Sequence, residues 1–200
     1  MTLTIFFAML SFSLSMSISP GPVNMMIISS SINNGFFKTF SFISGATIGF
    51  TLLLIFIAFG FSTIFLEYPD FLKYLGLFGA VFIIYMGYKI ASSSTKIEIK
   101  NDGKNLKFIE GFLLQCLNPK AWIASLSGVS MFSSSSDVLA SFILMYFIVC
   151  YLSLSFWGLL GQKARIFLNT NFRLKVFNII MGTVLILSAF SLIYIEFIAL

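Results

Sequence analysis

Ser19-Pro20-Gly21-Pro22-Val23-Asn24 interrupts an apolar run, Met1 to Phe37, that contains no charged residue. At about 1.5 Å per residue, an unbroken helix of this length would far exceed the roughly 30 Å hydrocarbon core of a bilayer. Proline removes backbone donors and glycine loosens a helix, so the motif predicts one membrane span that is broken near its middle. Asn33-Asn34-Gly35 marks the end of this span.

A second motif of the same kind, Asn118-Pro119-Lys120-Ala121, lies inside another apolar run, Phe108 to Ser133. Breaking a helix frees backbone donors and acceptors that lipid cannot satisfy, so such breaks persist where they meet protein, water or a ligand. The free N–H groups of a restarted helix favour an anion. We therefore take as candidate substrate-binding or pathway residues Pro20, Gly21, Pro22, Asn24, Asn118, Pro119 and Lys120.

The composition of the whole chain argues against a soluble protein. Of its 200 residues, 58% are hydrophobic and 10% are charged, whereas soluble domains average about 25% charged residues. About 20 apolar residues cross a bilayer as a helix, so the sequence predicts an all-α integral membrane protein with about six transmembrane helices. The expected spans are 1–37, 39–66, 71–91, 108–133, 138–162 and 176–195.

The expected spans divide into two three-helix halves of a single membrane domain, residues 1–200. The halves are 1–91 and 108–200, and a basic loop, 92–107, joins them. Because three spans is an odd number, the second half enters the membrane with the opposite topology. Broken helices at matching positions of two inverted repeats, here the first and fourth helices, are typical of secondary transporters. The alternative is that both prolines only kink packed helices, which is common in membranes.

Basic residues predict the orientation of the chain, because cytoplasmic loops are enriched in Lys and Arg. The connections after the first, third and fifth spans share one side and carry ten of the twelve basic residues. These ten are Lys38, Lys89, Lys96, Lys100, Lys104, Lys107, Lys163, Arg165, Arg173 and Lys175. We therefore expect these connections in the cytoplasm and both termini outside.

Lys120 lies near the middle of the fourth span, where inserting an ammonium group costs about 2.5 kcal/mol or more. Such a group faces a cavity or a partner, so one hypothesis is that Lys120 holds a substrate carboxylate. The other is that it snorkels, or caps carbonyl groups freed by the first break. Asn24 likewise suits a substrate contact or a bond across the gap beside Pro22. Gly45 and Gly49 have the spacing of close helix packing, within the chain or in a homo-oligomer.

No arrangement of residues for catalysis is present. The chain has no histidine, and its 2 cysteines, Cys116 and Cys150, both lie in apolar runs. We find no metal-ligand spacing, no paired carboxylates within the spans and no phosphate-binding loop. The basic residues lie in short stretches beside the expected membrane. We therefore expect no enzymatic activity, no catalytic residue, no metal, no cofactor and no nucleic-acid partner, with the lipid bilayer as the surroundings.

The sequence resembles the LysE/RhtB family of bacterial amino-acid exporters along its whole length. The similar segments are Ser19-Pro20-Gly21-Pro22 with Asn24 and Gly35, Gly45 with Gly49, Tyr74 to Lys89, Phe108 to Gly111, and Asn118-Pro119-Lys120-Ala121. The resemblance implies a multi-pass protein of the bacterial inner membrane that exports amino acids or close derivatives, with protons as the coupling ion. The third span and residues 90–96 are similar to the branch that exports cysteine and O-acetylserine.

Two departures from the family pattern bear on the substrate. Val23 separates Pro22 from Asn24, whereas many relatives place Asn directly after the second proline, which weakens any role carried over to Asn24. The acidic residues within the early helices of lysine-exporting relatives are absent, which favours a neutral or zwitterionic substrate.

The mechanism that we expect is alternating access. The substrate carboxylate would lie near Lys120 and the helix N-termini, and its ammonium group near carbonyls freed at Pro20 to Pro22. A different class of function, a small channel or a non-transporting membrane scaffold, stays open.

Overall fold

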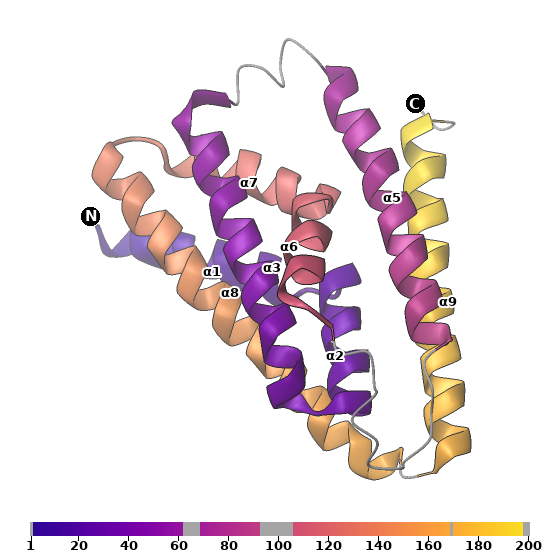
Figure 1. Ribbon diagram of the computed structural model, residues 1–200. Coiled ribbons are helices and arrows are strands. Elements are labelled where there is room, and N and C mark those ends of the chain that lie inside the picture. Colours follow the sequence, from indigo (N-terminus) through magenta and orange to yellow (C-terminus); the bar gives the residue numbers. More distant parts are fainter. Residues whose placement is uncertain (1, 62–68, 93–105, 169, 198–200) are drawn as a thin grey trace.

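The computed structural model describes residues 2–61, 69–92, 106–168 and 170–197, and within these ranges every regular element is a helix (Figure 1). The prediction of an all-helical chain is confirmed. The elements are α1 (Leu3–Ile18), α2 (Pro22–Asn34), α3 (Phe36–Phe56) with a π-helical end (Ile57–Phe61), α5 (Pro69–Ala91), α6 (Phe108–Cys116), α7 (Pro119–Phe132), α8 (Ser136–Ala164) with a 3-10 turn (Arg165–Phe167), and α9 (Asn171–Phe197).

Each proline motif separates two helices, α1 from α2 and α6 from α7. Most of the expected basic loop, 92–107, lies outside the described residues, as does the end of the second expected span, 62–66.

Three helical stretches are long and apolar enough to cross a membrane, namely Phe36–Phe59, Ser136–Phe167 and Asn171–Phe190. Leu3–Ile18 and Pro22–Asn34 make a fourth when the pair is counted as one span, with a bend of 59° at the break. Within α5 a shorter apolar stretch, Leu77–Ala91, is found among the described residues. The layout of six spans in two inverted halves stays a prediction.

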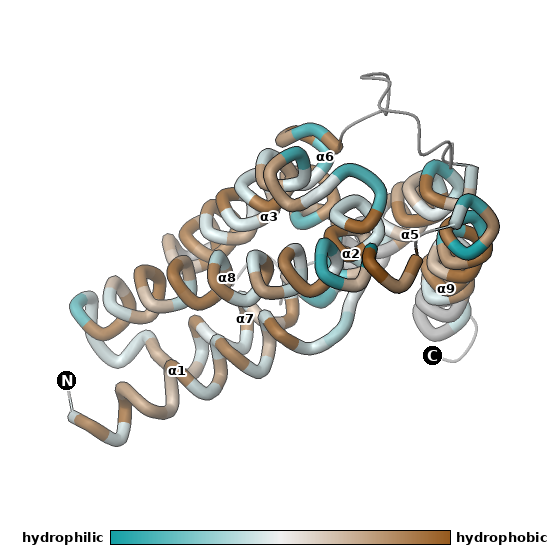
Figure 2. The backbone as a smooth tube through the Cα atoms, turned by 90° about the horizontal axis from the view of Figure 1, so that it is seen from below, coloured by the Kyte–Doolittle hydropathy of each residue, from teal (hydrophilic) through white to brown (hydrophobic). Residues whose placement is uncertain are grey.

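The helices α5 and α9 lie side by side at one edge of the molecule, and both views show the remaining helices grouped beside them (Figures 1 and 2). In this larger group, which we call the bundle, α3 packs against α6 and α8, and α1 and α2 also pack against α8. Polar contacts between described residues join the α5/α9 pair to the bundle. Lys89 of α5 forms an ion pair with Glu110 of α6, and the side-chain amides of Asn33 and Asn178 bond to each other over 2.8 and 3.0 Å.

The outer flanks of the helices are apolar. Large side chains such as Val81, Leu144 and Leu152 are more than half exposed, at 58%, 61% and 66%. Figure 2 views the molecule from the end where α6 and α9 begin, and hydrophilic positions gather at this end while the flanks are hydrophobic. An apolar belt with polar residues at an end is the surface that a lipid bilayer requires.

Gly45 and Gly49 lie where α3 crosses α6. A Cβ atom at Gly45 would fall 1.9 Å from the carbonyl oxygen of Phe108, and one at Gly49 would fall 3.0 Å from that of Phe112. Only glycine permits this approach of two backbones. In this structure the two glycines therefore serve a contact within the chain.

Candidate functional site

The first proline motif gives an abrupt change of direction rather than a kink. Ser19 and Gly21 are extended, with ψ of 136° and 177°, and Pro22 takes the first position of α2, where its missing N–H and fixed φ suit a helix start. The last carbonyl groups of α1 therefore lose the partners that a continuing helix would supply.

Lys120, from the start of α7, reaches across to this break. Its Nζ donates to the carbonyl oxygen of Ser19 over 2.9 Å and to Ser19 Oγ over 2.7 Å. The ammonium thus caps the end of α1, which was the structural interpretation of this residue. Lys120 also lines a cavity beside the break. An ammonium group has three N–H donors, and the two bonds to Ser19 leave the third for a ligand.

Two further side chains bind the freed carbonyls. Asn24 Nδ2 donates to the carbonyl oxygens of Ser17 and Ser19 over 3.1 and 3.3 Å, and so bonds across the gap. Trp157 Nε1 of α8 donates to the carbonyl oxygen of Ile18 over 3.1 Å. The end of α1 is therefore held by residues of α2, α7 and α8.

The start of α2 is different, because no side chain caps it within the described part of the chain. Its N-cap residue is Gly21, and a Cβ atom there would lie 3.7 Å from Lys120 Nζ. The positive end of the α2 dipole and a lysine ammonium thus converge on one point. This combination favours an anion such as a carboxylate.

The second break is closed by its own neighbours. Asn118 Oδ1 accepts from the N–H of Lys120 over 3.1 Å, and so caps α7. The N–H of Asn118 bonds to the carbonyl oxygen of Gln115 over 3.2 Å, and Trp122 Nε1 donates to that of Cys116 over 2.6 Å. The start of α7 is therefore already capped, unlike that of α2.

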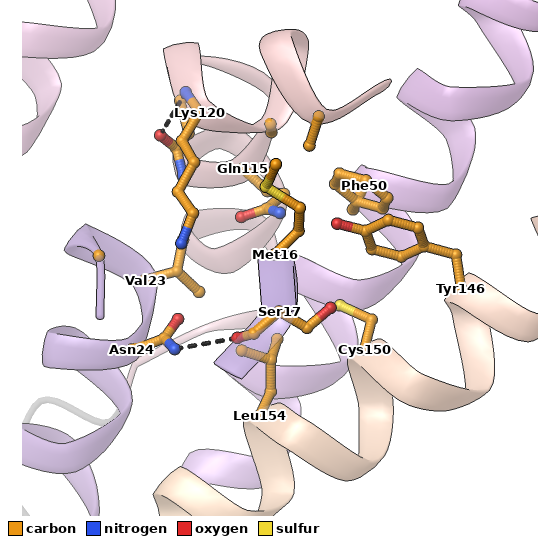
Figure 3. Close-up of a pocket in the computed structure, with 14 residues that line it drawn as sticks. Met16, Ser17, Val23, Asn24, Phe50, Gln115, Lys120, Tyr146, Cys150 and Leu154 are labelled. Carbon is orange, nitrogen blue, oxygen red and sulfur yellow. Dashed lines mark hydrogen bonds between the residues drawn. The ribbon is translucent and has the colours of Figure 1, made fainter. Parts of the chain in front are cut away.

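A cavity of about 30 Å³ lies between the two breaks (Figure 3). It has room for a water molecule or two, whereas pockets that bind small molecules measure about 300 Å³ or more. In the described conformation this space is therefore too small for an amino acid. Of the candidate residues, the structure places four at the cavity wall, Gly21, Asn24, Asn118 and Lys120, and leaves Pro20, Pro22 and Pro119 outside it.

The wall also includes polar residues that the sequence analysis did not propose as site residues. They are Ser17, Gln115, Tyr146 and Cys150. The Tyr146 ring stacks on Phe50 at 4.2 Å between centroids, and its hydroxyl points toward the cavity (Figure 3). The sequence contained one sign of Gln115 as a site residue. It is a glutamine within an apolar span, one helical turn before the second break.

Among the described residues that form the wall, Lys120 is the one cation, and none is Asp or Glu. In the described ranges no three His, Cys, Asp or Glu side chains lie close enough to hold a metal ion. The arrangement thus suits binding of an anionic group.

Comparisons of this sequence with family models and with known proteins indicate the same family. Residues 14–196 match the family model described as "LysE type translocator". A cysteine/O-acetylserine efflux protein of Escherichia coli O139:H28 is 27% identical over 97% of this chain and 100% of its own length. Its counterpart in Escherichia coli O157:H7 is 28% identical over the same shares. In strain K12 a protein of that name is 30% identical over 66% of this chain and 67% of its own length. No solved structure matches the chain.

Proposed function

We propose that this chain, which belongs to the LysE type translocator family, exports a neutral or zwitterionic amino acid or a close derivative in exchange for protons. Membership of the family makes it an amino-acid exporter of the bacterial inner membrane with several spans, and not an enzyme. The observation that carries the proposal is the cavity at the first break, where Lys120 and the uncapped start of α2 converge.

The charge of the cavity supports a neutral substrate. A zwitterion would place its carboxylate against Lys120 and the N–H groups at the start of α2. A cationic side chain would find no carboxylate to pair with among the described residues of the cavity wall. Because the relatives are named as cysteine/O-acetylserine efflux proteins, we propose L-cysteine and O-acetyl-L-serine as the first substrates to test.

The small volume of the cavity supports alternating access. An amino acid fits only when the helices around the cavity move apart, and we propose that the described conformation is one in which the site is contracted. The contacts Lys89–Glu110 and Asn33–Asn178 hold the α5/α9 pair to the bundle. We propose that they break when the cavity opens on their side, which the basic residues assign to the cytoplasm.

Export is tested by overproducing the protein in cells that are challenged with L-cysteine or O-acetyl-L-serine. We expect growth at concentrations that arrest control cells, together with accumulation of the compound in the medium. A channel or a scaffold does not move substrate against its gradient, so unchanged tolerance at normal abundance contradicts the proposal. Protein carrying Lys120→Met should confer clearly less tolerance than the wild type, because it binds the substrate carboxylate more weakly, and normal export by this variant at normal abundance would remove Lys120 from the mechanism.

Proton exchange is tested in proteoliposomes loaded with the transported amino acid. We expect an imposed pH gradient, acidic outside, to speed efflux of the amino acid, and collapse of the gradient by a protonophore to slow that efflux. Transport that ignores the gradient contradicts proton antiport and leaves amino-acid export intact. A phosphatase domain fused after Leu200 tests the orientation, because it is active only if the C-terminus lies outside.

A further inference from the structure

A zwitterionic substrate brings an ammonium group whose N–H donors need acceptors. The carbonyls freed at the first break are poor candidates in this structure. Those of Ser17 and Ser19 already accept bonds from Asn24 and Lys120. Pro20 is exposed and does not line the cavity. The expectation from the sequence names the carbonyls of Pro20 to Pro22. Of these residues Gly21 lines the cavity, and its carbonyl oxygen already accepts from the N–H of Met25 over 3.0 Å. That expectation stays a prediction, and a different acceptor lies on the cavity wall.

Gln115 supplies such an acceptor. Its side chain is 9% exposed and lines the cavity, and Oε1 has no hydrogen-bond partner within the described residues. Figure 3 shows its amide between Lys120 and the ring of Tyr146 in that view. A buried carbonyl oxygen without a partner destabilises the protein, so such a group in a native cavity indicates a ligand or water that completes it.

We propose that Gln115 Oε1 accepts a hydrogen bond from the α-ammonium group of the substrate. Gln115 is then a specificity-determining residue that selects amino acids over carboxylic acids lacking the amine. The inference rests on the proposed function, since it presumes an amino acid in this cavity.

An uncharged amide suits the binding of the ammonium group beside a lysine that binds the carboxylate. Lys120 and the start of α2 take the carboxylate, and an uncharged oxygen takes the ammonium. A glutamate in place of Gln115 would pair with Lys120 and remove the positive charge from the carboxylate. A neutral acceptor leaves that charge in place, because its dipole attracts the ammonium without neutralising the lysine.

The test is a counterflow assay in proteoliposomes with labelled L-cysteine kept reduced. The two inhibitors compared are unlabelled L-cysteine and 3-mercaptopropionate, which is cysteine without its amine. Wild-type protein should bind L-cysteine at least about tenfold more tightly, because a hydrogen bond to a charged group is lost with the amine. In the Gln115→Met protein we expect inhibition by L-cysteine to become as weak as that by 3-mercaptopropionate. The inhibition constant of 3-mercaptopropionate itself should change by less than about twofold.

Two further variants control for packing. Ser125→Ala removes a buried hydroxyl that has no hydrogen-bond partner among the described residues and does not line the cavity, and it should leave both inhibition constants unchanged. Gln115→Asn keeps the amide but withdraws it by one methylene group, and should lower the preference for L-cysteine in part. If the Gln115→Met protein does not fold, Gln115→Asn decides the question, and an unchanged preference there overturns the inference.

The failures of the two proposals are distinguishable. A Gln115→Met protein that still prefers L-cysteine to 3-mercaptopropionate overturns the role of Gln115 and leaves export intact. A variant that keeps this preference but no longer distinguishes L-cysteine from L-alanine shows that Gln115 binds the substrate side chain, which also overturns the inference. Wild-type protein that takes up neither labelled L-cysteine nor labelled O-acetyl-L-serine overturns the proposed substrate and this inference with it.

Discussion

The two proline motifs break two helices, yet the surroundings of the breaks differ. At the break between α1 and α2, Lys120 and Trp157, far away in the sequence, bind freed carbonyls together with Asn24. No side chain of the described residues caps the start of α2. At the break between α6 and α7, Asn118 caps the restarted helix from the adjacent position. The start of α2 can thus bind a ligand, whereas the start of α7 is already capped by Asn118. The second break supplies Lys120 to the first, so similar motifs have different roles.

The two breaks also differ in how tightly neighbouring atoms pack against them. A Cβ atom at Gly79 of α5 would fall 1.9 Å from the carbonyl oxygen of Leu117, so α5 presses directly on the second break. A Cβ atom at Gly21 would meet nothing nearer than 3.7 Å, and that neighbour is the Lys120 side chain. The cavity borders both breaks, since Asn118 lines it as well as Gly21 and Asn24, but the second break is the more tightly packed of the two.

Gly79→Ala should have the largest effect, because the added carbon meets backbone atoms that cannot rotate away. We expect a loss of about 3 kcal/mol or more of stability, as for severe overpacking. The measurement is the amount of folded protein in membranes and its thermal stability in detergent. Normal abundance of this variant would show that α5 does not press on the second break.

Lys120→Met should destabilise the first break by about 2 kcal/mol, since a hydrogen bond from a charged donor is lost at the Ser19 carbonyl. Lys120→Arg keeps a charged donor and should recover most of the stability. The midpoints of thermal unfolding of the two variants are compared with that of the wild type. Equal midpoints for all three would mean that the lysine does not cap α1.

Asn24→Ala should cost about 1.5 kcal/mol, because two hydrogen bonds across the first break are removed at once. Asn24→Asp is the matched control, as it keeps the size of the side chain but presents only acceptors to the carbonyls of Ser17 and Ser19. Both variants should unfold at a lower temperature than the wild type. If Asn24→Asp is as stable as the wild type, the amide does not donate across the gap.

Asn118→Ala should cost about 1 kcal/mol, the usual value for an N-cap. Asn118→Ser restores a capping oxygen and should recover most of this loss. Transport by both variants should follow their abundance, because the start of α7 is occupied by its own cap. A loss of transport by Asn118→Ser protein at normal abundance would show that the second break also contacts substrate.

Gly21→Ala should have the smallest effect on stability, within about 0.5 kcal/mol of the wild type. The φ of Gly21 is −164°, an extended conformation open to any residue, and the nearest atoms are at ordinary contact distance. The measurement is the midpoint of thermal unfolding of the Gly21→Ala protein, compared with that of the Gly79→Ala protein. A severe loss from Gly21→Ala would contradict the open character of the first break.

The positions of the breaks could be predicted from sequence because proline acts locally on the backbone. Asn118 before Pro119 also has the local signature of an N-cap and a first helical residue. The hydrogen-bond partner of Lys120 could not be predicted. Ser19 is 101 positions away, and the contact between the two residues depends on how the two halves of the chain pack. The role of Gly45 in the α3–α6 crossing was equally unresolved, since its spacing suits any close helix contact.

Gln115 was missed for a related reason. A single glutamine within an apolar run becomes notable only when its side chain is known to be buried without a partner, and burial is a property of the packed helices. The six-span layout and the orientation depend on residues 62–68 and 93–105 as well, which lie outside the described ranges.

The central claim is that Lys120 and the start of α2 hold a carboxylate, and counterflow with Lys120→Met protein tests it most directly. The inhibitors are 3-mercaptopropionate, which carries a carboxylate without an amine, and cysteamine, which carries an amine without a carboxylate. We predict that 3-mercaptopropionate loses at least about tenfold in potency while cysteamine changes by less than about twofold. Unchanged inhibition by 3-mercaptopropionate, in folded protein that still exchanges L-cysteine, would contradict the account.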